Sequence, residues 1–332
     1  MRPTILVTES SNFSEAAARR LIESGQTIFA DLDRPRLLKA SATADVLWVR
    51  LRHRIDREVM DASPRLKVIA SPTTGLNHID LREAELRGIR VISLRGETEF
   101  LDQIFATAEH TLALTFGLLR RVPAASAHAA EGGWNRDLFR GRELHGKTAG
   151  IIGYGRVGRM VAGYLQALGM AVLAADSDPG RSFANPQIKI VSLADLLDRA
   201  DLVSLHVSFT EANAGFFGQK EFERMKPGSW FINTSRGELV DEAALLQALE
   251  GGGIAGAALD VLSDERSSGM SGNALVEYAR SHDNLLITPH IAGCTLESMQ
   301  KTEDFLADKL AAFLDSQVEV TCVEARNAGD AR

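Results

Sequence analysis

The sequence predicts an α/β protein built from two doubly wound parallel sheets. Short apolar runs alternate with amphipathic helical patterns along the chain, and this alternation occurs in two blocks separated by a longer helical stretch. Strands that alternate with helices form parallel sheets, because each helix carries the chain back across a face of the sheet. The apolar runs are short and apolar on both sides, as expected of strands that are covered on both faces. The length of 332 residues suits two domains of ordinary size.

The first block covers residues 1 to about 95. Five short apolar runs predict its strands, near residues 5–7, 27–30, 46–49, 66–70 and 90–93. Helical patterns lie between these runs, for example from Ser14 to Glu23 and from Asp80 to Arg87. A long helical pattern then runs from Glu97 to about Arg121 without a breaker until Gly117. We interpret this last pattern as a hinge and crossing segment.

The second block runs from about residue 148 to 290. Its strands are predicted by apolar runs near residues 148–152, 170–175, 202–205, 230–233, 254–259 and 285–288. A last helical pattern, from about Leu296 to Leu314, is expected to return to the first domain. We therefore predict a first domain of residues 1–96 and 292–332. A second domain of residues 97–291 is inserted into it and includes a hinge segment near 97–147.

A glycine-rich turn opens the second block. Gly153, Gly155 and Gly158 follow the first apolar run of this block, and Asp176 ends the next run. The first glycine permits a tight turn, the second lets the backbone approach a pyrophosphate, and the third lets the following helix pack closely. An acid at the second strand end can accept hydrogen bonds from ribose hydroxyls. Strand, glycines, helix and acid in this register predict a dinucleotide-binding domain of the Rossmann type.

The acid at position 176 also bears on the choice of cofactor. A carboxylate there repels a 2′-phosphate, so the sequence favours NAD over NADP. Arg181, five residues further on, is the one nearby cation that argues for NADP.

Composition excludes several other classes of protein. A net charge of −7 argues against a general nucleic-acid or anionic-membrane surface. The N-terminal apolar run is too short for a signal peptide, and no run approaches the roughly 20 apolar residues of a membrane helix. The two cysteines, Cys294 and Cys322, have no spacing to histidines that would suit a metal. We expect a cytoplasmic protein without a metal site.

Three charged residues follow successive strands of the second block, where functional groups of doubly wound sheets collect. They are Arg236, Glu265 and His290. A guanidinium binds a carboxylate through two parallel hydrogen bonds and polarises an adjacent carbonyl. A histidine exchanges a proton with the carbonyl oxygen, and a carboxylate against its other nitrogen fixes the tautomer. Taken singly, each residue also fits a structural role, but together they predict hydride transfer to or from a 2-keto or 2-hydroxy acid.

With these motifs the chain resembles the D-2-hydroxyacid dehydrogenase family, most closely its phosphoglycerate dehydrogenase branch. Besides the glycine turn with Asp176, five stretches carry the resemblance: Thr74–Asp80, Ala106–His110, Met225–Gly228, Asn233–Gly237 and Thr288–Gly293. The resemblance implies a Rossmann domain inserted into a flavodoxin-like substrate domain. It also implies a homodimer that pairs through the region around Trp134, which makes the segment near 97–147 a dimerisation segment as well as a hinge. Because about 40 residues follow His290, we expect a short form without a regulatory domain.

The resemblance also implies roles for individual residues. Arg236 binds and polarises the substrate, Glu265 supports the histidine, and His290 is the acid/base. The implied cofactor contacts are Thr74, Thr107, Gly153, Gly155, Arg156, Val157, Gly158, Asp176, His206, Val207, Thr234, Ser235, Asp260, Ala292 and Gly293. The implied substrate contacts are Arg50, Thr74, Gly75, Leu76, Arg236 and His290. Two positions depart from the family pattern, because Ser208 removes a usual proline after His206 and Thr73 replaces a common glycine.

The implied activity is the NAD-dependent interconversion of a small D-2-hydroxy acid and its 2-keto acid, of the phosphoglycerate or hydroxypyruvate kind. Arg50, Arg52 and Arg54 follow a predicted strand and offer a site for a substrate phosphate or second carboxylate, although a solvated charge run fits them too. Two alternatives stay open: a reductase of glyoxylate, hydroxypyruvate or another 2-keto acid, and an NAD-sensing, corepressor-like binding protein.

Overall fold

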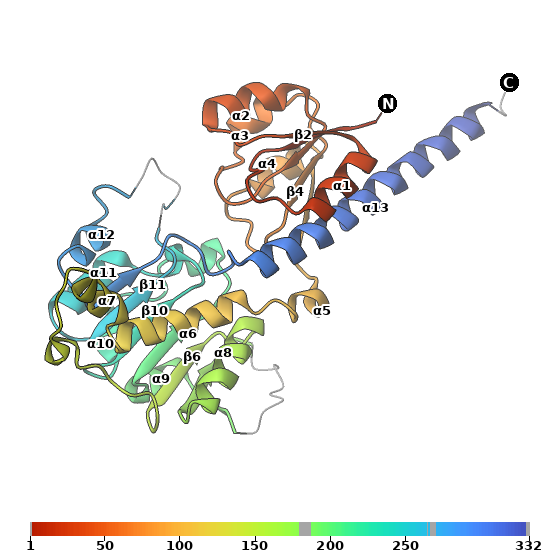
Figure 1. Ribbon diagram of the computed structural model, residues 1–332. Helices are drawn as coiled ribbons and strands as arrows, with labels where there is room; N and C mark the ends of the chain where they lie inside the picture. The colour runs from red at the N-terminus through yellow and green to blue at the C-terminus, as the bar shows by residue number, and fades with distance from the viewer. Residues whose placement is uncertain (1, 179–186, 264, 266–269, 330–332) are drawn as a thin grey trace. The chain divides into compact units, whose positions relative to one another are not determined.

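The computed structural model describes residues 2–178, 187–263, 265 and 270–329, with side chains as far as residue 316. The chain divides into two compact units (Figure 1). One comprises the residues up to Gln103 together with those from Thr295 onward, and the other comprises Ile104–Cys294. Each unit contains one parallel sheet with helices around it. The predicted α/β class with two parallel sheets is therefore confirmed.

The sheet of the first unit has the strand order β2-β1-β3-β4-β5. Its strands are β1 (Thr4–Val7), β2 (Gln26–Phe29), β3 (Val46–Trp48), β4 (Val68–Ser71) and β5 (Arg90–Ser93), all paired in parallel. The helices of this unit are α1 (Glu15–Ser24), α2 (Arg34–Ala40), α3 (Arg57–Asp61), α4 (Leu81–Leu86), α5 (Thr98–Leu101) and α13 (Leu296–Gly329), with a 3₁₀ turn at Ser41–Thr43. This is the flavodoxin-like order, which places ligands at the carboxyl ends of the strands.

Helix α13 packs against α1 in the first unit, and Figure 1 shows the two helices side by side. Leu306 and Leu310 are fully buried in the core that this packing forms with the sheet. Asp304 of α13 accepts a hydrogen bond from the Ala17 amide (3.1 Å) at the first turn of α1. The last helical segment thus completes the first unit, and it extends beyond the predicted end at Leu314.

The sheet of the second unit has the order β12-β11-β10-β9-β6-β7-β8. Its strands are β6 (Thr148–Ile152), β7 (Ala171–Ala175), β8 (Lys189–Ile190), β9 (Leu202–Leu205), β10 (Trp230–Asn233), β11 (Gly256–Leu259) and β12 (Leu285–Ile287). Its helices are α6 (Ala106–Leu119), α7 (Val122–Ala130), α8 (Arg156–Ala167), α9 (Leu193–Arg199), α10 (Gln219–Arg224), α11 (Glu242–Glu250) and α12 (Ala274–Ala279), with 3₁₀ turns η2 (Arg136–Phe139), η3 (Glu211–Asn213) and η4 (Gly237–Leu239). The sequence did not predict β8, a two-residue edge strand that pairs with β7.

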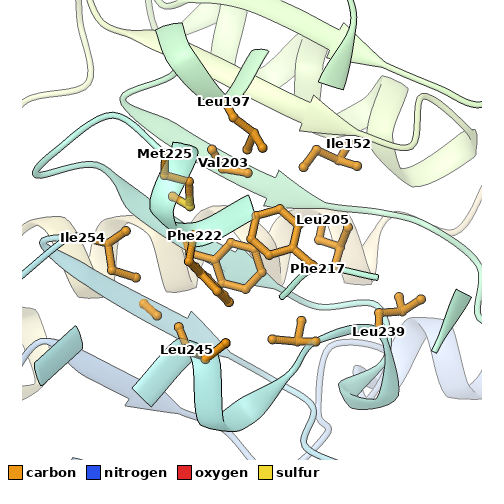
Figure 2. Packing of buried hydrophobic residues seen from close by; sticks show 14 of the residues in the cluster. Ile152, Leu197, Val203, Leu205, Phe217, Phe222, Met225, Leu239, Leu245 and Ile254 are labelled. Carbon is orange, nitrogen blue, oxygen red and sulfur yellow. The ribbon is translucent and has the colours of Figure 1, made fainter. Parts of the chain in front are cut away.

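An aromatic cluster forms the centre of the core in the second unit. The ring of Phe217 lies 4.8 Å from those of both Phe222 and Phe231, measured between centroids. Figure 2 shows Phe217 and Phe222 together, with Val203 and Leu205 of β9 close by. Edge-to-face and tilted aromatic pairs of this kind add to the stabilisation from burial alone. The cluster supports the middle of the sheet, and the chain segments that could carry a ligand lie at the ends of its strands.

The helical pattern predicted from Glu97 to Arg121 is not one helix. It forms α5 and α6, which are separated by residues 102–105. The Arg156 guanidinium of α8 donates a hydrogen bond to the Ile104 carbonyl (2.7 Å), so a residue remote in the sequence satisfies the backbone at this break. The boundary between the two units falls in the same segment.

Within the described part of the chain, none of the helices has both the length and the apolarity needed to cross a membrane. The same residues contain no cluster of three or more His, Cys, Asp or Glu side chains suited to hold a metal ion.

Candidate active site

The glycine turn after β6 has no room for a side chain at Gly153 or Gly158. Gly153 has φ +87°, and a Cβ there would lie 2.6 Å from the His206 carbonyl oxygen. A Cβ on Gly158 would lie 2.1 Å from the Gly153 carbonyl oxygen. Gly155 is the N-cap residue of α8, whose first turn presents backbone N–H groups to an anion. The turn is therefore a close-packed cradle at a helix N-terminus, which fits the pyrophosphate of a dinucleotide.

Asp176 stands directly after β7 and makes contacts that sequence reasoning missed. Its carboxylate accepts hydrogen bonds from the amides of Tyr154 (2.8 Å) and Asp178 (2.9 Å). The first of these bonds ties the acid to the glycine turn itself, so the carboxylate is held beside the cradle. Arg181, the cation that argues for NADP, lies outside the described residues.

Other predicted cofactor contacts gather at the carboxyl ends of the neighbouring strands. His206 and Val207 follow β9, and burial lowers the pKa of His206 to about 3, so the ring is neutral near pH 7. The same ring hydrogen-bonds the Ser204 hydroxyl (2.9 Å). After β10, the Thr234 hydroxyl pairs with that of Thr111 (2.8 Å) on α6. The structure thus brings these segments to the edge where the glycine turn lies.

Thr107 and Ser235, two more predicted cofactor contacts, take part in short-range hydrogen bonds. The Thr111 hydroxyl donates a hydrogen bond to the Thr107 carbonyl (2.8 Å) one helical turn earlier. Ser235 bonds the Asn233 side chain through both its amide (2.9 Å) and its hydroxyl (2.8 Å). Val157 is half-buried against the core of the second unit. These contacts stiffen the segments on which the proposed cofactor roles depend.

Arg236 follows β10 at the start of η4 and is half-buried. Its guanidinium donates a hydrogen bond to the Ser235 carbonyl (2.6 Å), and its own carbonyl accepts one from the Asn233 amide group (2.9 Å). The next residue, Gly237, packs so closely that an added Cβ would lie 2.0 Å from the Leu262 carbonyl carbon. The backbone that carries Arg236 therefore touches the segment that leads to Glu265.

Glu265 and His290 are in direct contact, although 25 positions separate them in the sequence. His290 Nδ1 lies 2.5 Å from a carboxylate oxygen of Glu265, and the other carboxylate oxygen accepts a hydrogen bond from the Leu262 amide (3.4 Å). His290 has φ +54°, a left-handed conformation that costs free energy in most residues and is enriched in histidine and asparagine. With Nδ1 engaged, Nε2 is the ring nitrogen that can serve a substrate.

Asp260 anchors the segment that holds His290 in this conformation. Its fully buried carboxylate accepts hydrogen bonds from the Thr288 hydroxyl (2.6 Å) and from the amides of Ile291 (2.9 Å) and Ala292 (2.8 Å). The His110 ring lies 3.3 Å from the same carboxylate. Burial alone would raise the pKa of Asp260, but these hydrogen bonds outweigh it and lower the pKa. Sequence reasoning treated Asp260 as a cofactor contact, and the structure adds this supporting role.

The predicted substrate loop lies in the first unit, after β4. Thr74 is exposed, Gly75 is half-buried and Leu76 is buried in the core. The Thr73 hydroxyl bonds the Ser71 hydroxyl (2.9 Å) and the Gly75 carbonyl (2.9 Å), so the departure from the family pattern at position 73 adds a link inside the loop.

Arg50 follows β3, the strand next to β4, and so lies at the same edge of the first sheet. Its guanidinium is paired with the Glu303 carboxylate of α13 and donates a second hydrogen bond to the Ser11 carbonyl (3.0 Å). Burial raises the pKa of Glu303 and also that of Glu9, which accepts a hydrogen bond from the Arg50 amide (3.0 Å). The sequence predicted that Arg50 binds a substrate anion and did not reveal its ion pair with Glu303.

In the second unit, the arrangement is suited to proton and hydride chemistry on a small acid. Arg236, Glu265 and His290 follow β10, β11 and β12, which are neighbours in the sheet. A carboxylate against Nδ1 fixes the orientation of the ring and leaves Nε2 to exchange a proton with a substrate. A guanidinium at the adjacent strand end can bind a carboxylate. The glycine cradle lies on the same carboxyl edge of this sheet.

Comparison with known proteins agrees with this geometry. Residues 112–292 match the family model described as D-isomer specific 2-hydroxyacid dehydrogenase, NAD binding domain. D-3-phosphoglycerate dehydrogenase from Mycobacterium bovis is 38% identical over 284 residues, which are 85% of this chain and 51% of that protein. Glyoxylate reductase from Thermofilum pendens is 35% identical over 86% of this chain and 83% of its own length.

Among solved structures, D-lactate dehydrogenase from Aquifex aeolicus, complexed with NAD and lactic acid, has a TM-score of 0.82. It is 27% identical, and the match covers 95% of this chain and 96% of that one. The chain spans about half the length of the D-3-phosphoglycerate dehydrogenases from Mycobacterium bovis and Archaeoglobus fulgidus that it matches. The predicted NAD cofactor agrees with the description of the matched domain. The family model, which matches more than half of the chain, and the relatives of 35–38% identity show that the chain belongs to the D-isomer specific 2-hydroxyacid dehydrogenase family.

Proposed function

We propose that the protein is an NAD-dependent oxidoreductase that interconverts a small D-2-hydroxy acid and its 2-keto acid, of the phosphoglycerate or hydroxypyruvate kind. The observation that carries the proposal is the contact of 2.5 Å between His290 Nδ1 and Glu265. This contact orients the ring and leaves Nε2 to act as a general acid or base. Arg236 on the neighbouring strand end and the glycine cradle supply the other two requirements, an anion ligand and a dinucleotide site.

In this proposal each residue has a defined task during reduction of the keto acid. Arg236 binds the substrate carboxylate and draws electron density from the adjacent carbonyl. His290 donates the proton on Nε2 to the carbonyl oxygen. A bound NADH would supply the hydride to the carbonyl carbon. Glu265 stabilises the imidazolium before the transfer and keeps the ring in place after it. In the direction of oxidation the same nitrogen accepts the hydroxyl proton.

The remaining residues of the proposal hold the two reactants. The segment Thr74–Leu76 binds the substrate carboxylate through backbone N–H groups, and Asp176 accepts hydrogen bonds from the adenosine ribose of NAD. The first unit is accordingly the substrate domain and the second is the NAD-binding domain. We place the protein in the cytoplasm.

A panel of small 2-keto acids with NADH tests the proposed function. We expect NADH oxidation with at least one of them, followed as loss of NADH absorbance. Tight NADH binding without turnover of any member of the panel would contradict the enzyme and favour an NAD-sensing binding protein. Turnover of glyoxylate alone would restrict the activity to a glyoxylate reductase.

Asp176 should set the preference for NADH over NADPH. Asp176→Ala removes the carboxylate that repels a 2′-phosphate, so we expect the ratio of kcat/KM for NADH to that for NADPH to fall by about tenfold or more. Asp178→Ala is the matched control, because it removes an exposed carboxylate two residues away. An unchanged ratio in Asp176→Ala, or an equal change in both variants, would remove Asp176 from cofactor selection.

The proposal includes a homodimer formed through the segment from α7 to η2. This segment exposes large apolar side chains, with Trp134 94% exposed and Val122 and Leu138 each more than half exposed. Trp134→Ser should shift the sedimentation behaviour of the protein from dimer toward monomer. A wild-type protein that sediments as a monomer at all concentrations would contradict the dimer.

A further inference from the structure

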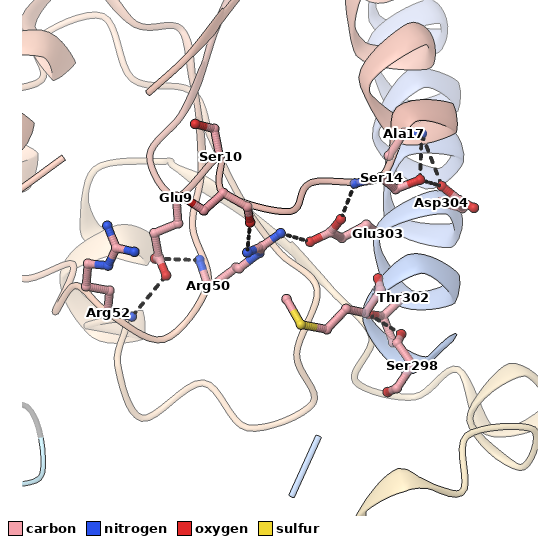
Figure 3. A network of polar contacts seen from close by, with 12 residues as sticks. Glu9, Ser10, Ser14, Ala17, Arg50, Arg52, Ser298, Thr302, Glu303 and Asp304 are labelled. Atoms are coloured by element: carbon pink, nitrogen blue, oxygen red, sulfur yellow. Dashed lines mark hydrogen bonds and ion pairs between the residues drawn. The ribbon is translucent and has the colours of Figure 1, made fainter. Parts of the chain in front are cut away.

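A buried ion pair occupies the edge of the first sheet where the substrate loop begins. Arg50 follows β3, and the segment from Thr73 follows β4, the adjacent strand. The Arg50 side chain is 15% exposed, and that of Glu303, its partner on α13, is 1% exposed. Figure 3 shows the guanidinium directed toward Glu303. Arg50, which is suited to bind a substrate anion, is therefore already paired with a carboxylate of the protein itself.

The pair is held from several sides. One carboxylate oxygen of Glu303 accepts a hydrogen bond from the Arg50 guanidinium, and the other accepts one from the Ser14 amide (2.7 Å). The Glu303 side chain therefore cannot rotate away without losing two hydrogen bonds. The guanidinium also donates to the Ser11 carbonyl (3.0 Å) and lies 5.7 Å above the centre of the Phe13 ring. In the described part of the chain, Arg50 Nε is buried without a hydrogen-bond partner. The arginine is fixed in place as well as neutralised.

The charges around the Arg50–Glu303 pair favour a neutral ligand group over an anionic one next to Arg50. Glu9 is buried and accepts hydrogen bonds from the amides of Arg50 (3.0 Å) and Arg52 (3.3 Å). The Arg52 guanidinium in turn lies 3.3 Å from Asp31. The carboxylates of Glu303 and Asp31 thus each pair with a guanidinium group, and the Glu9 carboxylate binds the backbone amides of the same two arginines. A phosphate dianion brought to Arg50 would meet Glu303 and Glu9 at short range, in a partly buried place where like charges repel strongly.

We propose that Glu303 is a specificity-determining residue: by occupying the Arg50 guanidinium it disfavours 2-keto acids with a phosphorylated tail and favours those with a small uncharged tail, such as hydroxypyruvate. The inference rests on the proposed function and chooses between the two substrate kinds that it contains. Specificity by an unfavourable charge is an efficient device, because the competing substrate must displace a protein group before it can bind.

The test compares three full-length proteins: wild type, Glu303→Gln and Asp304→Asn. Glutamine keeps an acceptor for the Ser14 amide but removes the charge from Arg50. Asp304→Asn is the matched control, since it removes the same charge from the next residue of α13, whose carboxylate bonds Ser14 and Ala17 and not Arg50. The quantity measured is the ratio of kcat/KM for 3-phosphohydroxypyruvate to that for hydroxypyruvate, with thermal unfolding of each protein as a check on folding.

We expect wild type to prefer hydroxypyruvate, Glu303→Gln to raise the ratio by about tenfold or more, and Asp304→Asn to leave it near the wild-type value. Adding Arg50→Gln to Glu303→Gln should abolish the gain, because the guanidinium is the group released. A wild-type preference for the phosphorylated acid, an unchanged ratio in Glu303→Gln, or an equal rise in Asp304→Asn would each overturn the inference.

Binding of inorganic phosphate, measured by calorimetry, separates this inference from the proposed function. If no keto acid is turned over by any of the proteins, the proposed function fails. Glu303 is still tested in that case, because Glu303→Gln should bind phosphate about tenfold more tightly than wild type and Asp304→Asn should not. Equal phosphate binding by all three proteins would overturn the role of Glu303 even then.

Discussion

Replacing His290 with alanine should lower turnover of the preferred 2-keto acid by on the order of 10²-fold or more, while NADH binding stays near that of the wild type. His290 Nδ1 is held by Glu265 at 2.5 Å, so in the proposed mechanism Nε2 is the nitrogen that gives a proton to the substrate. Steady-state kcat and the NADH dissociation constant, measured on the same preparations, check the expectation. Turnover equal to wild type would remove His290 from the mechanism.

A second variant separates chemistry from backbone conformation at this position. His290 has φ +54°, which alanine adopts only at a cost in free energy, whereas asparagine adopts it readily. His290→Asn should therefore retain the local backbone and still lose turnover to a similar extent. His282→Ala is the control, because this exposed ring stacks on Tyr278 and should not affect turnover. If His290→Asn restored most of the activity, the effect of alanine would be conformational.

Replacing Gly158 with alanine should abolish measurable NADH binding and lower the midpoint of thermal unfolding. The added Cβ would lie 2.1 Å from the Gly153 carbonyl oxygen, so either the turn or the start of α8 must move. A shift there misplaces the N–H groups that face the pyrophosphate. Overpacking against the backbone typically costs about 1–3 kcal/mol, or more where no side chain can yield. NADH titration by fluorescence and a thermal melt measure the two effects.

Gly163 offers a control in the same helix, because nothing lies within 4 Å of a Cβ built there. Gly163→Ala should leave NADH binding unchanged and stabilise the helix by up to about 1 kcal/mol, the difference in helix propensity between the two residues. Wild-type affinity in Gly158→Ala would contradict the close packing of the cradle. Loss of binding in both variants would show that α8 tolerates no change at all.

Much of the fold was predictable because its signals are local. Every strand except β8 coincides with a short apolar run in the sequence, and the glycines of the turn follow β6 in the register that the predicted site requires. The placing of Glu265 and His290 after successive strands also led to a correct expectation of proximity, since neighbouring parallel strands end at the same edge. The catalytic and binding roles assigned to these residues stay predictions until the variants are measured.

The features that sequence reasoning missed depend on contacts between distant parts of the chain. The break between α5 and α6 has no local breaker, and its Ile104 carbonyl is satisfied by Arg156, 52 positions away. The edge strand β8 is only two residues long and has no periodicity to detect. Asp260 holds the His290 segment through side-chain and backbone bonds that span about 30 positions. None of these contacts leaves a pattern in a window of neighbouring residues.

The sequence by itself determined the α/β class, the two sheets, the dinucleotide cradle and the family, because strand, turn and helix signals are written in residues close together. Only the tertiary structure decided the surroundings of Arg50. Its partner Glu303 is 253 positions away, on a helix that the sequence assigned to the first domain without indicating which of its charges would meet Arg50. Whether a charged side chain can bind a substrate depends on which opposite charge the fold places next to it, and on how well water reaches the pair. Both are properties of tertiary packing and not of local sequence.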